Sequence, residues 1–238
     1  MADNEIMTLG AGKSRKILFI MSDGGPLHIP DGSAGDTGIF TGKDFRRDIS
    51  LLENASVELT ALVLPGTDAS LDLRVALCGE GASCRLYGLY LCPGSEDVRI
   101  NVELDHKVPH CTSDQLFKGI VSGTAKAGFY GRIIVDQGAF KTEAYQANHS
   151  LLLSDSARVE TLPQLEIYAD DVKCSHGATI GKLNAEEQFY MRSRGIPEKE
   201  AKVLQMLSFL SPVLERFPGG ETRDRVSAYM EDVIRLHF

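Results

Sequence analysis

The chain has 238 residues, of which 43% are hydrophobic and 24% charged, proportions that are typical of a folded globular protein. Its formal net charge of -8, without a long run of Lys or Arg, argues against nucleic-acid binding through a basic surface. The N-terminus, MADNEIM, is acidic where a signal peptide would be basic, and the first apolar run, Ile17 to Met21, is too short to span a membrane. We therefore expect a cytoplasmic protein that does not associate with membranes.

The first motif, Gly10-Ala-Gly-Lys-Ser14, resembles the end of a phosphate-binding loop, but the first glycine of that pattern would fall at Met7. The residues that follow, RKILFIM, read as a strand where such a loop requires the start of a helix. We therefore expect this chain to bind no nucleotide.

From Ser14 to about Ile180, apolar residues recur at every second position between clusters of Gly, Asp, Asn and Pro. This alternation predicts one short strand after another and no long helix. A clear example contains the alternating residues Leu71, Leu73, Val75 and Leu77. Two stretches, ASCRLYG from Ala82 and AKAGFYG from Ala125, match in outline, so similar strand units recur along the chain.

The spacing of these units favours a solenoid. Ala139 and Ala157 open comparable stretches, which gives a repeat of about 16 residues, suited to one coil of two short strands. The pattern favours a parallel β-helix, although an antiparallel β-sandwich would also produce many short alternating strands. In either fold Pro163 would mark a corner between two strands, because a central strand cannot spare its backbone N–H.

The periodicity changes at Asn184, where Asn184-Ala-Glu-Glu187 has the pattern of a helix-capping box. Gly195 is a typical helix stop, and Pro197 is a typical first-turn residue of a second helix. Two apolar stripes at helical spacing follow: Val203, Met206, Leu207 and Leu210, and then Val226, Tyr229, Met230, Val233, Ile234 and His237. We therefore predict a β-helix domain over residues 1–183 and a small helical domain over residues 184–238.

The cysteines are Cys78, Cys84, Cys92, Cys111 and Cys174. Their odd number and the absence of C-x-x-C spacing predict reduced thiols, most of them buried. One of them ends the segment His106-Lys-Val-Pro-His110-Cys111, which gathers three zinc-type ligands. Neighbouring residues on an extended chain point to opposite faces, so His110 and Cys111 could share an ion only in a loop, and we favour a structural role.

The stretch VKCSHGATIG, residues 172–181, contains the pair Cys174-x-His176. At this spacing on a strand, both side chains project from one face with their Cβ atoms about 7 Å apart. The pair could supply two ligands to a metal or cluster, or could combine a thiolate with an imidazole. Two ligands do not complete a site, so the remaining ones would come from another strand or another chain.

Three acidic residues, Glu166, Asp170 and Asp171, precede this pair. Grouped carboxylates on a β-helix are compatible with a polysaccharide lyase or hydrolase, in which two carboxylates divide the acid and base roles. Trp is absent and aromatic residues make up only 7% of the chain, which leaves few platforms for sugar stacking. Solvated turn residues are therefore the preferred interpretation.

Residues 151–196, LLLSDSARVETLPQLEIYADDVKCSHGATIGKLNAEEQFYMRSRGI, closely resemble the SufD branch of the SufB/SufD family. VPHCTSDQLFKGI and GRIIVDQGAFKTEAYQ resemble it too, so the resemblance extends from about Leu71 to the C-terminus. It implies a right-handed parallel β-helix followed by a C-terminal helical domain, in a scaffold protein for iron-sulfur cluster assembly that is not itself an enzyme.

The resemblance also implies partners. A SufD-type chain pairs with a SufB-like subunit through the β-helix edges and contacts a SufC-like ABC ATPase through its C-terminal helices. In the family, the histidine of the K-C-S-H-G motif lies at the SufB/SufD interface and takes part in forming a transient cluster opposite a SufB cysteine. That metal-site role carries over to His176, with Cys174 a less certain neighbour and His110 and Cys111 as further candidates.

The sequence departs from the family in two respects. Family members usually have an N-terminal helical region and a longer β-helix, so we interpret this sequence as a shortened SufD-like chain. Where SufB would carry its cluster cysteine, this sequence has Asn148-His149, so we expect it to need a partner to build a cluster. Two alternatives to a scaffold subunit stay open: a homodimeric iron-sulfur or zinc protein, and a carbohydrate-active β-helix enzyme.

Overall fold

The structure is a computed structural model that describes residues 5–22, 37–217 and 220–238. The first four residues of the acidic N-terminus lie outside the described residues. The strands are β1 (Glu5–Leu9), β2 (Ser14–Met21), β3 (Thr37–Gly42), β4 (Asp44–Leu51), β5 (Ser56–Val63), β6 (Ala69–Leu77), β7 (Ser83–Cys92), β8 (Asp97–His106), β9 (Thr112–Val121), β10 (Lys126–Val135), β11 (Glu143–Leu152), β12 (Arg158–Ile167) and β13 (Lys173–Gly181). The helices are α1 (Ala185–Ser193), α2 (Glu198–Leu214) and α3 (Glu221–His237).

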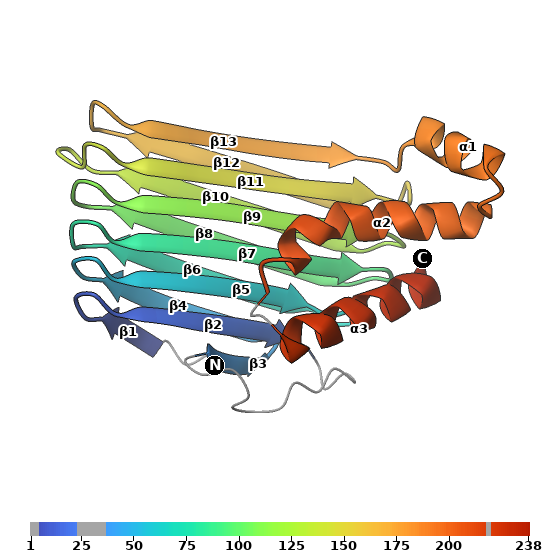
Figure 1. The fold of residues 1–238 in the computed structure, drawn as a ribbon, viewed down its shortest axis with the longest axis horizontal. Coiled ribbons are helices and arrows are strands. Elements are labelled where there is room, and N and C mark those ends of the chain that lie inside the picture. The colour runs from blue at the N-terminus through green and yellow to red at the C-terminus, as the bar shows by residue number, and fades with distance from the viewer. Residues whose placement is uncertain (1–4, 23–36, 218–219) are drawn as a thin grey trace.

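The strands form two sheets that lie against each other (Figure 1). The first sheet has the order β1-β4-β6-β8-β10-β12, and the second has the order β13-β11-β9-β7-β5-β2-β3. From β4 onward the chain alternates between the sheets, so each coil adds one strand to each sheet. Every strand pair is parallel, which confirms the expected parallel β-helix and excludes the antiparallel sandwich.

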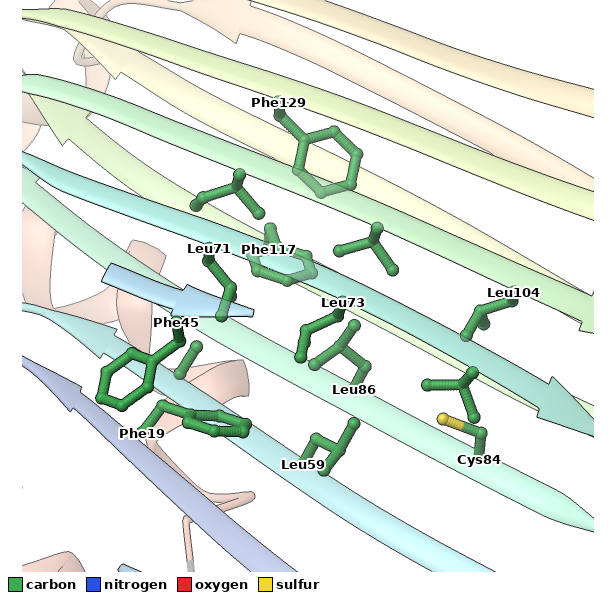
Figure 2. Close-up of a cluster of buried hydrophobic side chains, with 14 of the residues drawn as sticks. Phe19, Phe45, Leu59, Leu71, Leu73, Cys84, Leu86, Leu104, Phe117 and Phe129 are labelled. Atoms are coloured by element: carbon green, nitrogen blue, oxygen red, sulfur yellow. The ribbon is translucent and has the colours of Figure 1, made fainter. Parts of the chain in front are cut away.

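Alternating side chains build the core between the two sheets. The residues predicted to face inward from β6 are all buried: Leu71, Leu73, Val75 and Leu77. Figure 2 shows this core, in which the rings of Phe117 and Phe129 lie with their centroids 4.9 Å apart. A Cβ atom on Gly88 would lie 2.2 Å from the Phe117 ring, so the absence of a side chain there makes room for the aromatic pair.

The coil is longer than the alanine spacing predicted. Lys173 pairs with Glu143, which lies 30 residues earlier in the chain. The predicted repeat is half a coil, because the strands are longer than expected; β11 and β12, for example, have 10 residues each. Ala82 accordingly precedes β7 in the second sheet, whereas Ala125 precedes β10 in the first sheet.

Pro163 lies inside β12 and not at a corner, contrary to the prediction. At the two ends of β12, the N–H groups of Arg158 and Tyr168 donate to the carbonyls of Ala125 and Val135, on the side of β10. Since alternate residues of a parallel strand bond to the same neighbour, position 163 faces away from β10. β12 is the edge strand of its sheet, so the missing N–H removes no ladder hydrogen bond.

The helices begin at the predicted cap, where Oδ1 of Asn184 accepts hydrogen bonds from the N–H groups of Glu186 and Glu187. α2 and α3 cover the outer face of the second sheet (Figure 1), and their apolar stripes form a second buried cluster with sheet residues such as Leu89 and Ile120. α1 differs from them, because none of its 9 residues is buried. Within the part of the chain that the structure describes, no helix is long and apolar enough to cross a membrane.

All five cysteines are free thiols, as predicted. Cys84, Cys92 and Cys111 are buried, and Cys78 and Cys174 are partly buried. Burial raises the pKa of Cys84 to about 12 and also raises the pKa of Cys92, so both side chains act as small apolar residues.

Candidate functional site

β13 places Cys174 and His176 on one face. In the pairing with β11, Cys174 lies opposite Ala144 and His176 lies opposite Gln146, and both of these partners are buried inside the solenoid. Cys174 and His176 therefore face the inside of the last coil, formed by β12 and β13, as their spacing predicts. In Figure 1, β13 is the outermost strand of the second sheet, so His176 is exposed while Cys174 is half-buried.

The two side chains differ in their surroundings. Cys174 packs against the apolar core, and burial raises the pKa of its thiol despite an opposing hydrogen bond from the backbone of Ala144. Cys174 is therefore protonated at neutral pH and must lose its proton before it can bind a metal ion. The imidazole of His176 is exposed and can bind a metal through a ring nitrogen.

The last coil also has free backbone edges. The N–H of Lys173 donates to the carbonyl of Thr142, so alternate residues of β13 bond toward β11. The intervening residues direct their N–H and C=O groups away from the sheet; they are Cys174, His176, Ala178 and Ile180. Among the described residues, no strand pairs with this edge. The edge of β13 is continuous, whereas the edge of β12 is interrupted by Pro163.

Apolar side chains surround this open coil. Leu165 in β12 is only partly buried, whereas Ile133, its partner in β10, is fully buried. The large exposed apolar residues on these two strands and on the turn between them are Leu162, Ile167, Tyr168 and Ile180. An uncovered apolar face with free strand edges is suited to the addition of a further strand or a second solenoid.

The structure does not bring His110 and Cys111 together as ligands. Cys111 is fully buried, its Sγ lies 3.4 Å from the carbonyl oxygen of Gly79, and burial raises its pKa. His110 has a φ of 59° and is exposed, with Nε2 3.8 Å from the carboxylate of Glu80. In the described part of the chain, no group of three or more His, Cys, Asp or Glu residues is arranged to hold a metal ion.

Asn148 and His149 occupy opposite faces of β11. Asn148 is buried; its Nδ2 donates to Oγ1 of Thr161 at 3.0 Å, and its Oδ1 accepts from the hydroxyl of Tyr90 at 3.2 Å. His149 lies on the outer face with Nδ1 2.7 Å from Oγ1 of Thr179, and partial burial lowers its pKa. Asn148 therefore belongs to an internal hydrogen-bond network one coil below the exposed face of β13.

The three acidic residues ahead of the Cys-His pair do not converge. Glu166 forms an ion pair with Arg132 at 3.4 Å, and Asp171 forms one with Lys141 at 2.5 Å. Asp170 is exposed in the turn before β13. Two of these carboxylates are engaged with separate cations, which does not favour the paired acid and base roles of a carbohydrate-active enzyme.

A second exposed surface lies at the helices. α1 and α2 border a groove of about 560 Å³, which is lined in part by Tyr190 and Leu204. Phe189 and Tyr190 expose 72% and 60% of their surface, so α1 presents two large aromatic side chains to solvent.

One side chain holds α1 against α2. Nε2 of Gln205 donates to the carbonyl oxygen of Asn184 at 3.0 Å and to Oε2 of Glu187 at 2.7 Å. Oε1 of Gln205 accepts a hydrogen bond from Nε2 of Gln188 at 2.9 Å. Because α1 follows β13 after only a short connection, this contact links the last coil to α2.

Sequence reasoning missed the polar interior beneath the Cys-His pair. Gln115 and Gln146 face inward, and so do Asn148 and Ser150. The signal was present as polar residues at every second position of β11, but that pattern equally describes an exposed face when the pairing is unknown.

Residues 45–209 match the family described as SUF system FeS cluster assembly, SufBD core domain. The iron-sulfur cluster assembly protein SufD of Escherichia coli is 39% identical over 181 residues, which cover 76% of this chain and 43% of that protein. An iron-sulfur cluster assembly SufBD family protein of Synechocystis sp. is 43% identical over 157 residues, covering 65% of this chain and 34% of that protein. Protein ABCI7, chloroplastic, of Arabidopsis thaliana is 36% identical over 166 residues, or 68% of this chain and 34% of that protein.

The chain thus spans less than half the length of these relatives. The family match covers most of the solenoid together with α1 and much of α2, and it includes β13 with its Cys-His pair. The parallel β-helix and the similarity to SufD agree, and the chain belongs to the SufB/SufD family of the SUF iron-sulfur cluster assembly system as a SufD-like member.

Proposed function

We propose that this chain is a non-enzymatic scaffold subunit for iron-sulfur cluster assembly, which pairs with a SufB-like subunit and docks a SufC-like ABC ATPase. One observation carries the proposal: the inner face of the last coil is uncovered and bears His176 and Cys174. In a chain of this family, two candidate ligands on an open face imply that the remaining ligands come from the partner.

The edge of β13 is the proposed pairing surface. Its free N–H and C=O groups can bond to an added strand, and Leu165 and Ile180, which face the inside of the last coil, supply apolar contact. The residues with free backbone groups are also those whose side chains face the inside of the coil. A partner strand on this edge would therefore lie directly beside Cys174 and His176.

His176 is the proposed ligand for the nascent cluster, which is cargo and not a resident cofactor. Its exposed ring can reach a cluster held between two subunits, while Cys174 lies deeper and is protonated. Metal binding at Cys174 would release a proton, so we assign it a secondary role.

The helices are the proposed docking surface for the ATPase. α2 and α3 are anchored to the second sheet by their buried stripes, whereas α1 presents Phe189 and Tyr190 beside the groove. Because α1 is joined to β13 and is held to α2 through Gln205, movement of a docked ATPase can be transmitted to the last coil.

Co-expression with SufB-like and SufC-like proteins tests this proposal. We expect the three chains to co-purify, and we expect the double substitution Tyr190→Ser and Leu204→Ser to release the ATPase while the SufB-like chain stays bound. Tyr145→Ser, which changes a half-exposed tyrosine on β11 far from the groove, is the matched control and should release neither partner. Failure of the unmodified chain to retain either partner would contradict the proposal.

A homodimer is the second candidate, and one observation favours it. The last coil has two free edges, β12 and β13, and a second copy could cover both of them around a twofold axis. Two copies of Cys174 and His176 would then supply four ligands. Light scattering and metal analysis of the chain expressed without SufB test the homodimer. A dimer whose bound iron or zinc is lost in His176→Ala supports the homodimer, and a metal-free monomer rejects it.

A further inference from the structure

Two glutamine side chains lie buried inside the solenoid without a protein partner. Gln115 in β9 and Gln146 in β11 pair in register and expose only 1% and 3% of their surface. The amide oxygen and nitrogen of both side chains make no hydrogen bond to any group among the described residues.

These glutamines stand in an inward-facing column that changes character along the solenoid. The same column contains Leu59 in β5 and Leu86 in β7, which lie in the apolar core shown in Figure 2. It continues through Gln115 and Gln146 and ends at His176 in β13. Successive members are separated by one strand spacing of roughly 4.8 Å. This column therefore becomes polar over the two coils beneath the exposed histidine.

The neighbourhood shows that the fold can satisfy buried polar groups. Two residues beyond Gln146 on the same strand, Asn148 bonds to both Tyr90 and Thr161. A leucine at position 115 or 146 would leave no unpaired polar atom, as Leu86 demonstrates one coil below. Buried amides without protein partners are rare in folded proteins, and bound water is the usual reason for their presence.

A glycine on the opposite sheet provides space for the side-chain amide of Gln146. A Cβ atom on Gly131 in β10 would lie 1.7 Å from Nε2 of Gln146, so any larger residue there would displace the amide. A further unpartnered atom lies nearby: Nδ1 of the fully buried His106, whose Nε2 is 2.9 Å from Oγ of Ser113. Ser113 faces inward two residues before Gln115 on β9.

The chemistry of these groups favours an uncharged bound molecule. The amides carry no charge, and burial lowers the pKa of His106 to about 4, so this histidine is neutral at neutral pH. An anion or cation in this interior would have no compensating charge. Water matches this chemistry, because the two amides together offer four hydrogen-bonding atoms and a buried water molecule requires two to four partners.

We propose that Gln115 and Gln146 form an internal binding site for ordered water, one to two coils beneath His176. The site places hydrated amides behind the open inner face of the last coil, in the column that holds leucine in the earlier coils. The site lies within this chain and requires neither a partner nor a cluster.

The test is a water-to-amide nuclear Overhauser measurement on the full chain labelled with ¹⁵N. The side-chain amide signals of Gln115 and Gln146 are assigned through bonds to their own backbone signals, so no substitution is required. We expect both amides to show direct cross-relaxation with water of long residence time, while the exposed Gln164 shows only the exchange typical of surface amides.

The hydroxyl of Ser113 exchanges its proton with solvent and could relay the signal, so the measurement is repeated with Ser113→Ala. Persistence of the water signal at both glutamines supports the site. Absence of cross-relaxation at both amides in the unmodified chain, or its loss in Ser113→Ala, would show a dry interior and overturn the inference. Either result leaves the proposed scaffold role to its own test.

Discussion

Replacing Ala178 with proline tests which edge of β13 is free and which is paired with β11. The N–H of residue 178 points away from β11, so Ala178→Pro removes no hydrogen bond within the chain. We expect the free energy of unfolding to change by less than about 1 kcal/mol, as the natural Pro163 is accommodated at the equivalent edge of β12. Ser175→Pro is the matched control, because the N–H of Ser175 points toward β11 and donates within the sheet. Loss of that ladder bond should lower the unfolding free energy by about 2–3 kcal/mol.

The same pair of substitutions measures partner binding. In Ala178→Pro an added strand loses one hydrogen bond and meets the proline ring, so we expect the affinity for a SufB-like partner to fall at least about tenfold, equivalent to about 1.4 kcal/mol. Urea unfolding and calorimetric titration supply the two quantities. If Ala178→Pro destabilises the chain as much as Ser175→Pro, the assignment of the free edge is wrong. If Ala178→Pro binds the partner as tightly as the unmodified chain, the β13 edge is not the interface.

Three further outcomes follow from the contacts. Burial lowers the pKa of His106 to about 4 from an unfolded value of about 6.5. The neutral histidine therefore contributes about 3 kcal/mol to the free energy of unfolding above pH 6.5, and this contribution is lost as the pH falls toward 4. In His106→Leu, the free energy of unfolding measured with urea should depend less steeply on pH between 4 and 6.5. An unchanged pH dependence would contradict the burial of His106. The buried carboxylate of Glu96 accepts hydrogen bonds from the N–H groups of Gly66 and Gly94 at 2.9 and 2.8 Å. Glu96→Ala should therefore lower the unfolding free energy by about 3 kcal/mol. A loss under about 1 kcal/mol would contradict this role of the carboxylate. Gln205→Leu removes the bonds that hold α1, so amide hydrogen exchange should accelerate in α1 and stay unchanged in α3; equal protection of α1 in both proteins would refute the linking role.

Much of the fold followed from the sequence because period-two alternation reports directly which residues are buried. Leu71, Leu73, Val75 and Leu77 occupy the core as predicted, and the helix start at Asn184 was set by a local hydrogen-bond pattern. The coil length was not predictable from Ala82 and Ala125. A small residue precedes strands of both sheets, so its spacing marks a half coil and not a full one.

The candidate site was predicted only in part, because its main features depend on strand pairing. The spacing of Cys174 and His176 placed them on one face, but the free edge of β13 depends on its position as the last strand of a sheet. The corner expected at Pro163 is absent because β12 is an edge strand, in which a proline N–H is not needed. Gln146 could not be recognised as buried, because polar residues at alternate positions normally indicate an exposed face.

The most direct test is the iron and acid-labile sulfide content of the complex purified with SufB-like and SufC-like chains. We expect the unmodified complex to carry both, and we expect His176→Ala to form the same complex with most of the iron and sulfide lost. His149→Ala, which changes a histidine on the outer face of the neighbouring strand, should keep both at the unmodified level. Retention of iron and sulfide in the His176→Ala complex, or equal loss in His149→Ala, would contradict the assignment of the cluster to the open face of the last coil.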